Sequence, residues 1–562
     1  MEIKYKKYKI PVLLLIVLLS AGCKKNFLDT RIDTEMTPED LATNRGTIWA
    51  FASAFYIPIN YGFQVLDNNM LAAISDEAQQ TAASGNVYYF NRGVVNADIN
   101  PLAFLYNDYY EGIRAANFFL DYAKNGEALM ALNRDTVRDA NGYQRDLATL
   151  RWYRAEAQIA KAYYYSELIK MYGGVPVVDS TLDKDPDPGR IPRSSYDEVV
   201  QYIVNLIDTY INELQEDWKT SDGFANQDGR FDRATALAIK ARVLLYAASP
   251  LNNPGNDVVK WQKAASAAQA LIDAKGYTIP ENRNYGDLFA GNNPVQSPEV
   301  IFAIRRPDNN EVEMNNYPIS TPGGRSGITP THNLVSAYEY TGTPDPDNPY
   351  ANRDPRLQSS VVVNGSWWNG REINEAAGGA DDMNKSNTSR TGYYLKKFLT
   401  DDVNLIQGAA TQHQWIIFRY TEALLNYAEA MNEAYGPDDL PDGYTITARQ
   451  ALMQVRRGAS TDLPEITTAD KDEFRNTVKH ERRVELAFED HRYWDLLRWK
   501  DAKAVLNQPI VGLKITKDGS GKYHYTTANV AERVFMDRNY RFPFSRNEIM
   551  NSNGTMSQNE GY

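Results

Sequence analysis

Residues 481–499, which read ERRVELAFEDHRYWDLLRW, combine many ionisable side chains with several aromatic rings. Their apolar side chains recur every three or four residues, which predicts an amphipathic helix. Glu481, Glu485, Glu489 and Arg492 would form a second, charged stripe along that helix. We therefore expect a helix packed on both sides, with arginine–carboxylate pairs joining it to neighbouring segments.

Two carboxylates of this stretch could instead act as the acid and base of a glycosidase. On a continuous helix Glu485 and Asp495 would lie about 15 Å apart, at about 1.5 Å per residue. Glycosidases hold their two catalytic carboxyl groups about 5–9.5 Å apart. The spacing favours a structural role, and we assign no catalytic residue.

Aromatic rings in irregular segments are a second source of chemistry, because a sugar ring can stack its CH face on them. The candidates are Tyr88 in the run Tyr88-Tyr89-Phe90, Tyr317, and the pair Trp367-Trp368. The alternative for each ring is burial in the packed loops. In an extended segment 88–90, alternate residues would point to opposite faces. Binding and burial both stay open at this point.

The composition limits the possible partners. The chain has 562 residues and a formal net charge of −12 with a pI near 5.2, which argues against a nucleic-acid partner. The sequence contains no HExxH, Walker, GxSxG or GxGxxG motif. Asp345, Asp347, Asn348 and Asp354 could gather around calcium, but the prolines between them favour an ordinary solvated turn. We expect no cofactor and no metal.

The first 23 residues predict export. A lysine-rich start precedes the apolar run 10–19, which is too short to span a membrane and suits a signal peptide. Leu19-Ser20-Ala21-Gly22-Cys23 looks like the lipobox of a bacterial lipoprotein, and Cys23 is the only cysteine. We predict a signal peptide over 1–22 and a lipid anchor on Cys23; the alternative is an ordinary signal peptide with a stray cysteine.

The rest of the chain, 23–562, reads as one mainly α domain. Helical patterns cover about 37–60, 101–276 and 411–505, with paired helices and alanine-rich faces typical of tetratricopeptide-like hairpins. The stretch of about 277–410 is irregular and rich in Gly, Pro, Asn and Asp. Because so long an irregular stretch in a compact protein is usually functional, we expect a loop-rich ligand-binding subdomain there.

Residues 481–499 closely resemble the signature helix of the SusD/RagB-like outer-membrane lipoproteins of glycan-foraging Gram-negative bacteria. Other blocks resemble the same family: residues 154–176, 233–242, 419–432, 542–544 and 557–562. The resemblance implies a non-catalytic, surface-exposed lipoprotein of the outer membrane that captures glycan and delivers it to a SusC-like TonB-dependent transporter. Some relatives serve peptide uptake, so a RagB-like peptide ligand is one alternative, and a glycoside hydrolase is an alternative of another class.

The candidate ligand-binding residues are Asp76, Glu77, Tyr88, Tyr317, Arg325, Trp367 and Trp368. Asp76 and Glu77 match one ligand-contacting region that the resemblance implies, and Tyr317 and Arg325 fall in the other. The two tryptophans and Tyr88 are included for their chemistry alone.

Overall fold

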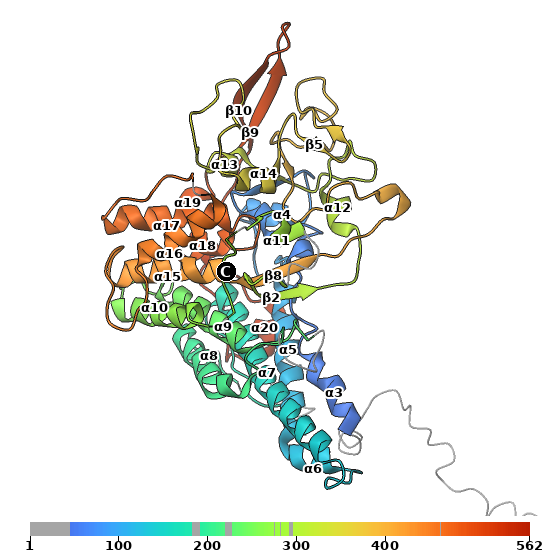
Figure 1. The fold of residues 1–562 in the computed structure, drawn as a ribbon, viewed down its shortest axis with the longest axis vertical. Helices are drawn as coiled ribbons and strands as arrows, with labels where there is room; N and C mark the ends of the chain where they lie inside the picture. The colour runs from blue at the N-terminus through green and yellow to red at the C-terminus, as the bar shows by residue number, and fades with distance from the viewer. Residues whose placement is uncertain are drawn as a thin grey trace, which may run out of the picture.

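The computed structural model describes residues 45–182, 191–219, 227–274, 276–281, 283–290, 296–460 and 462–562 (Figure 1). The predicted signal peptide, Cys23 and the first part of the expected helix at 37–60 lie outside these residues. The described part is mainly helical and carries a loop-rich region with short strands, which confirms the predicted fold class. Figure 1 shows the long helices in its lower and left parts and the loops with β5, β9 and β10 above them.

Scaffold helices pack against one another in a row: α5 on α7, α7 on α8, α8 on α9, α9 on α10 and α10 on α15, which also packs on α16 and α17. The scaffold helices are α3 (Arg45–Ala54), α5 (Ala103–Tyr122), α6 (Gly126–Ala131), α7 (Ala140–Tyr172), α8 (Tyr196–Tyr210), α9 (Arg233–Ala248), α10 (Val258–Ile272), α15 (Tyr420–Ala434), α16 (Ala448–Ala459), α17 (Lys471–Glu485) and α18 (Arg492–Arg498). Local chemistry sets several ends. Ser195 and Glu198 form a capping box at the start of α8, and Gly173, with a φ of 77°, ends α7.

Shorter helices occupy the connections and the loop-rich region. They are α4 (Asn86–Asn91), α11 (Asp287–Ala290), α12 (Glu311–Asn316), α13 (His332–Val335), α14 (Arg356–Ser360), α19 (Ala502–Val505) and α20 (Arg546–Asn551), with a 3₁₀ turn, η7, at Leu405–Gln407.

Five antiparallel strand pairs are present in the described residues. They are β1 (Ala78–Gln80) with β3 (Ile328–Pro330), β2 (Val300–Arg305) with β8 (Gln414–Arg419), β4 (Val361–Val362) with β7 (Tyr394–Leu395), β5 (Trp367–Trp368) with β6 (Arg371–Glu372), and β9 (Ile510–Lys517) with β10 (Tyr523–Ala531). The expectation that helices resume at 411 is wrong, because the strand β8 precedes the next helix. All six side chains of β8 are buried, and its β-prone run QWIIFR pairs with β2 before α15 begins at Tyr420.

The expected single helix over 481–499 is also wrong, because the chain breaks between α17 and α18. Phe488 and Asp490 adopt left-handed backbone conformations with φ of 66° and 62°. The carbonyl oxygen of Glu485 accepts a 3.0 Å hydrogen bond from Arg419, and that of Ala487 accepts one of 2.9 Å from the Lys397 ammonium. The break thus gives buried cations of other segments access to carbonyl groups that a continuous helix would use internally.

The predicted arginine–carboxylate pairs form a buried network, called here the central ion cluster. Its five basic and five acidic side chains, none more than 4% exposed, are Arg283, Arg356, Lys397, Arg419, Arg456, Glu299, Asp354, Glu481, Glu485 and Glu489. Glu485 lies at its centre, within 2.6–2.8 Å of Arg283, Arg356 and Arg419. Because Arg356 and Lys397 come from the loop-rich region, the cluster fixes that region to the helices.

Candidate functional site

A short strand pair brings the two predicted ligand-contacting regions together. Ala78–Gln80 in β1 pairs with Ile328–Pro330 in β3, and the Thr331 hydroxyl donates a 2.6 Å hydrogen bond to the Asp76 carbonyl oxygen. We call the surface that results the loop-rich face; it is formed by residues 67–92, 315–330, 366–382 and 400–408.

A tight hairpin presents Trp367 on this face. β5 and β6 are joined by Asn369 and Gly370, whose φ values of 53° and 72° give a two-residue turn of the kind that matches strand twist. Strand alternation sends the two tryptophans to opposite faces, so Trp367 is 71% exposed whereas Trp368 is 4% exposed. The hairpin therefore offers one large aromatic surface to solvent.

Trp368 and Tyr317 support the hairpin from behind rather than facing solvent. Tyr317 is fully buried, and its ring meets that of Trp368 edge-on at 6.2 Å between centroids. The Tyr317 hydroxyl donates to the Thr400 carbonyl oxygen and accepts from the Val403 amide, and burial raises its pKa well above the usual value. The Lys396 ammonium lies 5.5 Å from the centre of the Trp368 ring. The structure places these two predicted residues behind the surface.

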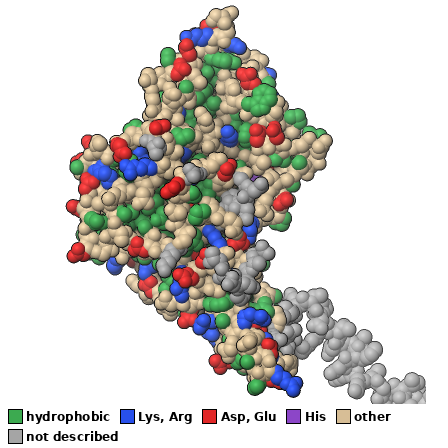
Figure 2. Space-filling view, in the orientation of Figure 1, with side chains coloured by type: hydrophobic (Ala, Val, Ile, Leu, Met, Phe, Trp, Pro, Cys, Tyr) green, Lys and Arg blue, Asp and Glu red, His purple; other side chains and the backbone are tan. Residues whose placement is uncertain are grey.

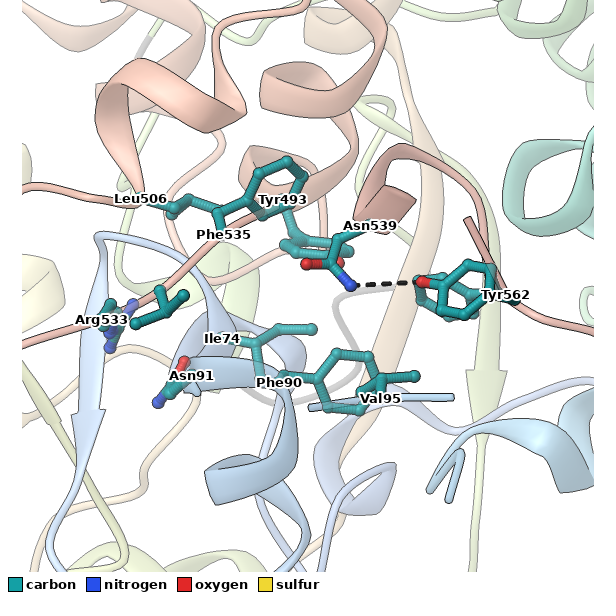
Figure 3. Close-up of a pocket in the computed structure, with 12 residues that line it drawn as sticks. Ile74, Phe90, Asn91, Val95, Tyr493, Leu506, Arg533, Phe535, Asn539 and Tyr562 are labelled. Carbon is teal, nitrogen blue, oxygen red and sulfur yellow. Dashed lines mark hydrogen bonds between the residues drawn. The ribbon is translucent and has the colours of Figure 1, made fainter. Parts of the chain in front are cut away.

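Tyr88 lies on a helix, which corrects the extended segment expected at 88–90. The segment forms α4, and Tyr88 is 46% exposed with the Arg92 guanidinium 5.6 Å from its ring. Phe90 points the other way and lines a cavity of about 20 Å³ with Tyr493 and Tyr562 (Figure 3). That volume suits one water and no sugar. Phe90 thus anchors α4 in the cavity wall, and Tyr88 lies at the surface.

Arg325 is exposed on the same face. Its guanidinium makes a 3.3 Å hydrogen bond to the Asn315 side-chain oxygen. Arg325 is therefore placed to donate a hydrogen bond to a ligand hydroxyl oxygen.

Asp76 and Glu77, in contrast, are 5% and 1% exposed. Arg492 and Arg483 hold the Asp76 carboxylate at 2.8 and 2.7 Å. Although burial opposes ionisation, these two guanidinium groups keep the pKa of Asp76 well below its usual range. The structure places both carboxyl groups in the packing between the face and α18, not on the surface.

Glu77 should make folding pH-dependent. Burial and the adjacent Asp76 raise its pKa to about 8, against an ordinary 4.5. Between these values the folded state holds a proton that the unfolded state has lost, so the stabilisation is present below pH 4.5 and disappears as the pH rises through 8. Wild type should lose on the order of 2 kcal/mol of unfolding free energy between pH 5 and 7 relative to Glu77→Gln. Urea unfolding across this range measures the difference.

The matched control for Glu77→Gln is Glu465→Gln, whose side chain is 63% exposed. Its unfolding free energy should follow that of wild type at every pH. Parallel pH profiles for wild type and Glu77→Gln would contradict the assignment of the raised pKa to Glu77.

The sequence reading missed two apolar side chains on the loop-rich face. Ile406 is 72% exposed on η7, and Ile319 is 38% exposed. The sequence feature that could have identified Ile406 is the apolar pair Leu405-Ile406 inside a polar loop. Leu405 is held in place by close packing against Gly323, which leaves Ile406 outward.

The candidate calcium ligands do not form one group. The Asp345 carboxylate accepts the amides of Asp347 and Asn348 at 2.8 and 3.3 Å, as in an ordinary Asx turn. Asp354 instead pairs with Arg356 at 2.6 Å in the central ion cluster. Within the described residues, no His, Cys, Asp and Glu side chains gather in threes as metal ligands would.

The comparisons with known proteins agree across nearly the whole chain. Residues 298–562 match a family model described as the SusD family, and residues 26–245 match one described as starch-binding and associating with the outer membrane. SusD-like protein P38 of Formosa agariphila is 28% identical over 382 residues, covering 64% of this chain and 69% of that protein.

Solved structures share the fold. A SusD-like protein of Bacteroides fragilis gives a TM-score of 0.75 at 23% identity and covers 93% of this chain and 98% of its own. A SusD-like carbohydrate-binding protein of the same species gives 0.73 at 23% identity, covering 92% and 100%. Among the residues described here, no helix is both long and apolar enough to cross a membrane.

Proposed function

Because the chain belongs to the SusD/RagB-like family, we propose that it captures glycan on its loop-rich face and delivers it to a SusC-like TonB-dependent transporter. The observation that carries the glycan proposal is Trp367, a tryptophan 71% exposed on a tight hairpin. An exposed indole offers apolar area for a sugar ring. The model matched by residues 26–245 is described as starch-binding, and one solved relative as carbohydrate-binding.

The contact residues proposed are Trp367, Tyr88 and Arg325, with Ile319 and Ile406 added from the structure. These five side chains are exposed and come from the segments that form the loop-rich face. Asp76, Glu77, Tyr317 and Trp368, which were predicted as contacts, are proposed to position that face from within.

A binding role without hydrolysis is favoured over the glycoside hydrolase alternative. The carboxylates first considered for catalysis, Glu485 and Asp495, are 0% and 2% exposed and engaged by arginines. A peptide ligand, as implied by the RagB-like resemblance, is the remaining alternative within the binding class.

A polysaccharide panel tests the proposal. The purified protein should be retarded in affinity gels that contain at least one polysaccharide, without releasing reducing sugar from it. Release of reducing sugar would replace the proposal with a hydrolase. Binding to peptides and to no polysaccharide would favour the peptide alternative.

The proposed lipid anchor gives a direct prediction. Cys23 follows Leu-Ser-Ala-Gly and is the only cysteine of the chain. One acyl chain binds a membrane only marginally, at about 10⁴ M⁻¹, so stable anchoring needs more than one. In a cell fractionation, Cys23→Ala should move most of the protein from the membrane to the soluble fraction. Retention of the variant in the membrane fraction would place the anchor elsewhere.

An apolar patch that adjoins α4 is the proposed docking surface for the transporter. Six large apolar side chains, each 38–68% exposed, come from two neighbouring segments: Val94, Ile99, Phe104, Val534, Met536 and Met550. Two backbone hydrogen bonds join the segments. The Val534 amide donates to the Asn91 carbonyl oxygen at 2.9 Å, and the Arg546 amide donates to the Ala97 carbonyl oxygen at 3.1 Å. A patch of this kind, rimmed by the Asp98–Arg546 ion pair, is typical of a protein interface.

Charge introduced into this patch should weaken the complex. In mild detergent, Phe104→Asp with Met550→Asp should reduce the co-purified transporter by about tenfold or more, because an unpaired carboxylate in an apolar interface costs several kcal/mol. Val258→Asp is the matched control, since Val258 is 43% exposed, like Phe104, but lies on α10. Equal transporter recovery from both variants would rule out this surface.

A further inference from the structure

We propose that the part of the loop-rich face around Trp367 selects uncharged glycans and rejects acidic ones, which carry sulfate or uronic acid groups. The inference rests on the proposed function and adds the charge class of the ligand. Its basis is the set of carboxylates around Trp367. In Figure 2 the surface over β5 shows hydrophobic side chains with acidic side chains beside them.

Two of these carboxylates lie against the hairpin turn. The Asp401 side chain accepts a 2.8 Å hydrogen bond from the backbone amide of Asn369, two residues after Trp367. The Asp402 carboxylate lies 3.9 Å from the position that a Cβ would take on Gly370. Both aspartates are exposed. They therefore lie beside the turn that follows Trp367.

The third carboxylate belongs to the hairpin itself. Glu372 is exposed and is the cross-strand partner of Trp367. Directly opposed residues of an antiparallel pair have Cβ atoms about 4.5–5.5 Å apart. A ligand stacked on Trp367 thus lies near three exposed carboxylates, from Glu372, Asp401 and Asp402.

The nearby cations do not balance these charges. Arg371 is neutralised by Asp381, with two contacts of 2.8 Å. Lys396 lies behind the surface, against the ring of the buried Trp368. At the hairpin, three exposed carboxylates therefore stand against one partly covered ammonium group, that of Lys396, and the immediate surroundings of Trp367 are net negative.

The chemistry then separates the two classes of ligand. Ionised carboxylates only accept hydrogen bonds, and the hydroxyl groups of a neutral sugar donate them. A sulfate or uronate has no proton to donate and is repelled over several ångströms, and salt screens that repulsion. Acidic polymers, which repeat the charge along the chain, are affected most.

The experiment compares matched polysaccharide pairs that share a backbone: dextran with dextran sulfate, hydroxyethyl cellulose with carboxymethyl cellulose, and laminarin with its sulfated form. Binding of the full protein is measured by affinity electrophoresis and calorimetry at low salt. For any backbone that is bound, the neutral member should bind about tenfold or more tightly than the acidic one. The ratio should fall in 0.5 M salt.

The variant that tests the residues is Glu372→Gln with Asp402→Asn. It leaves Asp401 in place because that side chain holds the hairpin turn. The acidic member should gain about fivefold or more in affinity. The neutral member should change by less than about twofold, because the Gln and Asn side-chain oxygens still accept hydrogen bonds from sugar hydroxyl groups. Asp462→Asn with Glu465→Gln, exposed acids after α16, is the control and should change neither.

Each outcome decides the proposal. Tighter binding of an acidic member by wild type would overturn the inference and leave glycan capture intact. Neutral selectivity that the double variant does not reduce would overturn the role of these carboxylates. Binding to no polysaccharide of any pair would overturn the proposed function, and the inference with it.

Discussion

Glu485→Gln should lower the free energy of unfolding by about 3–5 kcal/mol, although the substitution preserves the size of the side chain. Glu485 is fully buried and lies within 2.6–2.8 Å of three guanidinium groups, those of Arg283, Arg356 and Arg419. Glu485 is the carboxylate that these three guanidinium groups share, so its removal leaves buried positive charge without its compensating partner. Urea unfolding followed by tryptophan fluorescence at neutral pH measures the loss.

The control is the same chemical change at an exposed pair. Asp438 accepts two hydrogen bonds from Arg449, at 2.6 and 2.7 Å, and its side chain is 55% exposed. Asp438→Asn should cost at most about 1 kcal/mol, because solvent screens such pairs. If Glu485→Gln costs no more than this control, the cluster does not hold the loop-rich region as described.

The contribution of Glu485 to the unfolding free energy depends on pH with the opposite sign to the contribution of Glu77. Although burial disfavours the charged form, Arg283, Arg419 and Arg356 hold the pKa of Glu485 far below its ordinary 4.5. The stabilisation is therefore present above pH 4.5 and is lost as the pH falls toward the folded-state value. The difference between wild type and Glu485→Gln should narrow in acid.

The sequence predicted the scaffold because helix periodicity and capping are local. Ser195 with Glu198 and the stop at Gly173 are visible in the sequence and are found in the structure. The break after Glu485 could not be foreseen in this way. There the carbonyl oxygen of Glu485 accepts hydrogen bonds from Arg419 and Tyr285, which are 66 and 200 residues away in sequence. Tertiary contacts there outweigh local propensity.

In the candidate site, too, local rules predict one part and contacts between distant residues decide the rest. Strand alternation implies that only one of Trp367 and Trp368 can face solvent, but the sequence does not say which one. Tyr317 and Lys396, distant in sequence, decide it by packing against Trp368. The buried position of Asp76 likewise depends on Arg492, which is 416 residues away in sequence.

Trp367→Ala should abolish most glycan binding and leave the fold intact. Loss of one stacking aromatic costs about 1–3 kcal/mol by analogy with base stacking, which is about 5- to 150-fold in affinity. A shallow sugar site that binds in the millimolar to micromolar range would then fall near or below detection. Because Trp367 is 71% exposed, its removal should change the unfolding free energy by no more than about 0.5 kcal/mol. Calorimetry with a polysaccharide bound by wild type measures the loss.

Substitution of the neighbouring Trp368 provides the comparison for this test. Trp368 is 4% exposed and packs edge-on against Tyr317, so Trp368→Ala should cost about 3–5 kcal/mol of stability as a large buried side chain. Trp367→Phe keeps a flat ring at the surface and should retain most of the affinity. Wild-type binding by a folded Trp367→Ala would show that the indole is not the stacking platform. Family membership would stand, and the ligand contacts would have to be sought at Tyr88 and Arg325 instead, on the part of the loop-rich face formed by β1, β3 and α4.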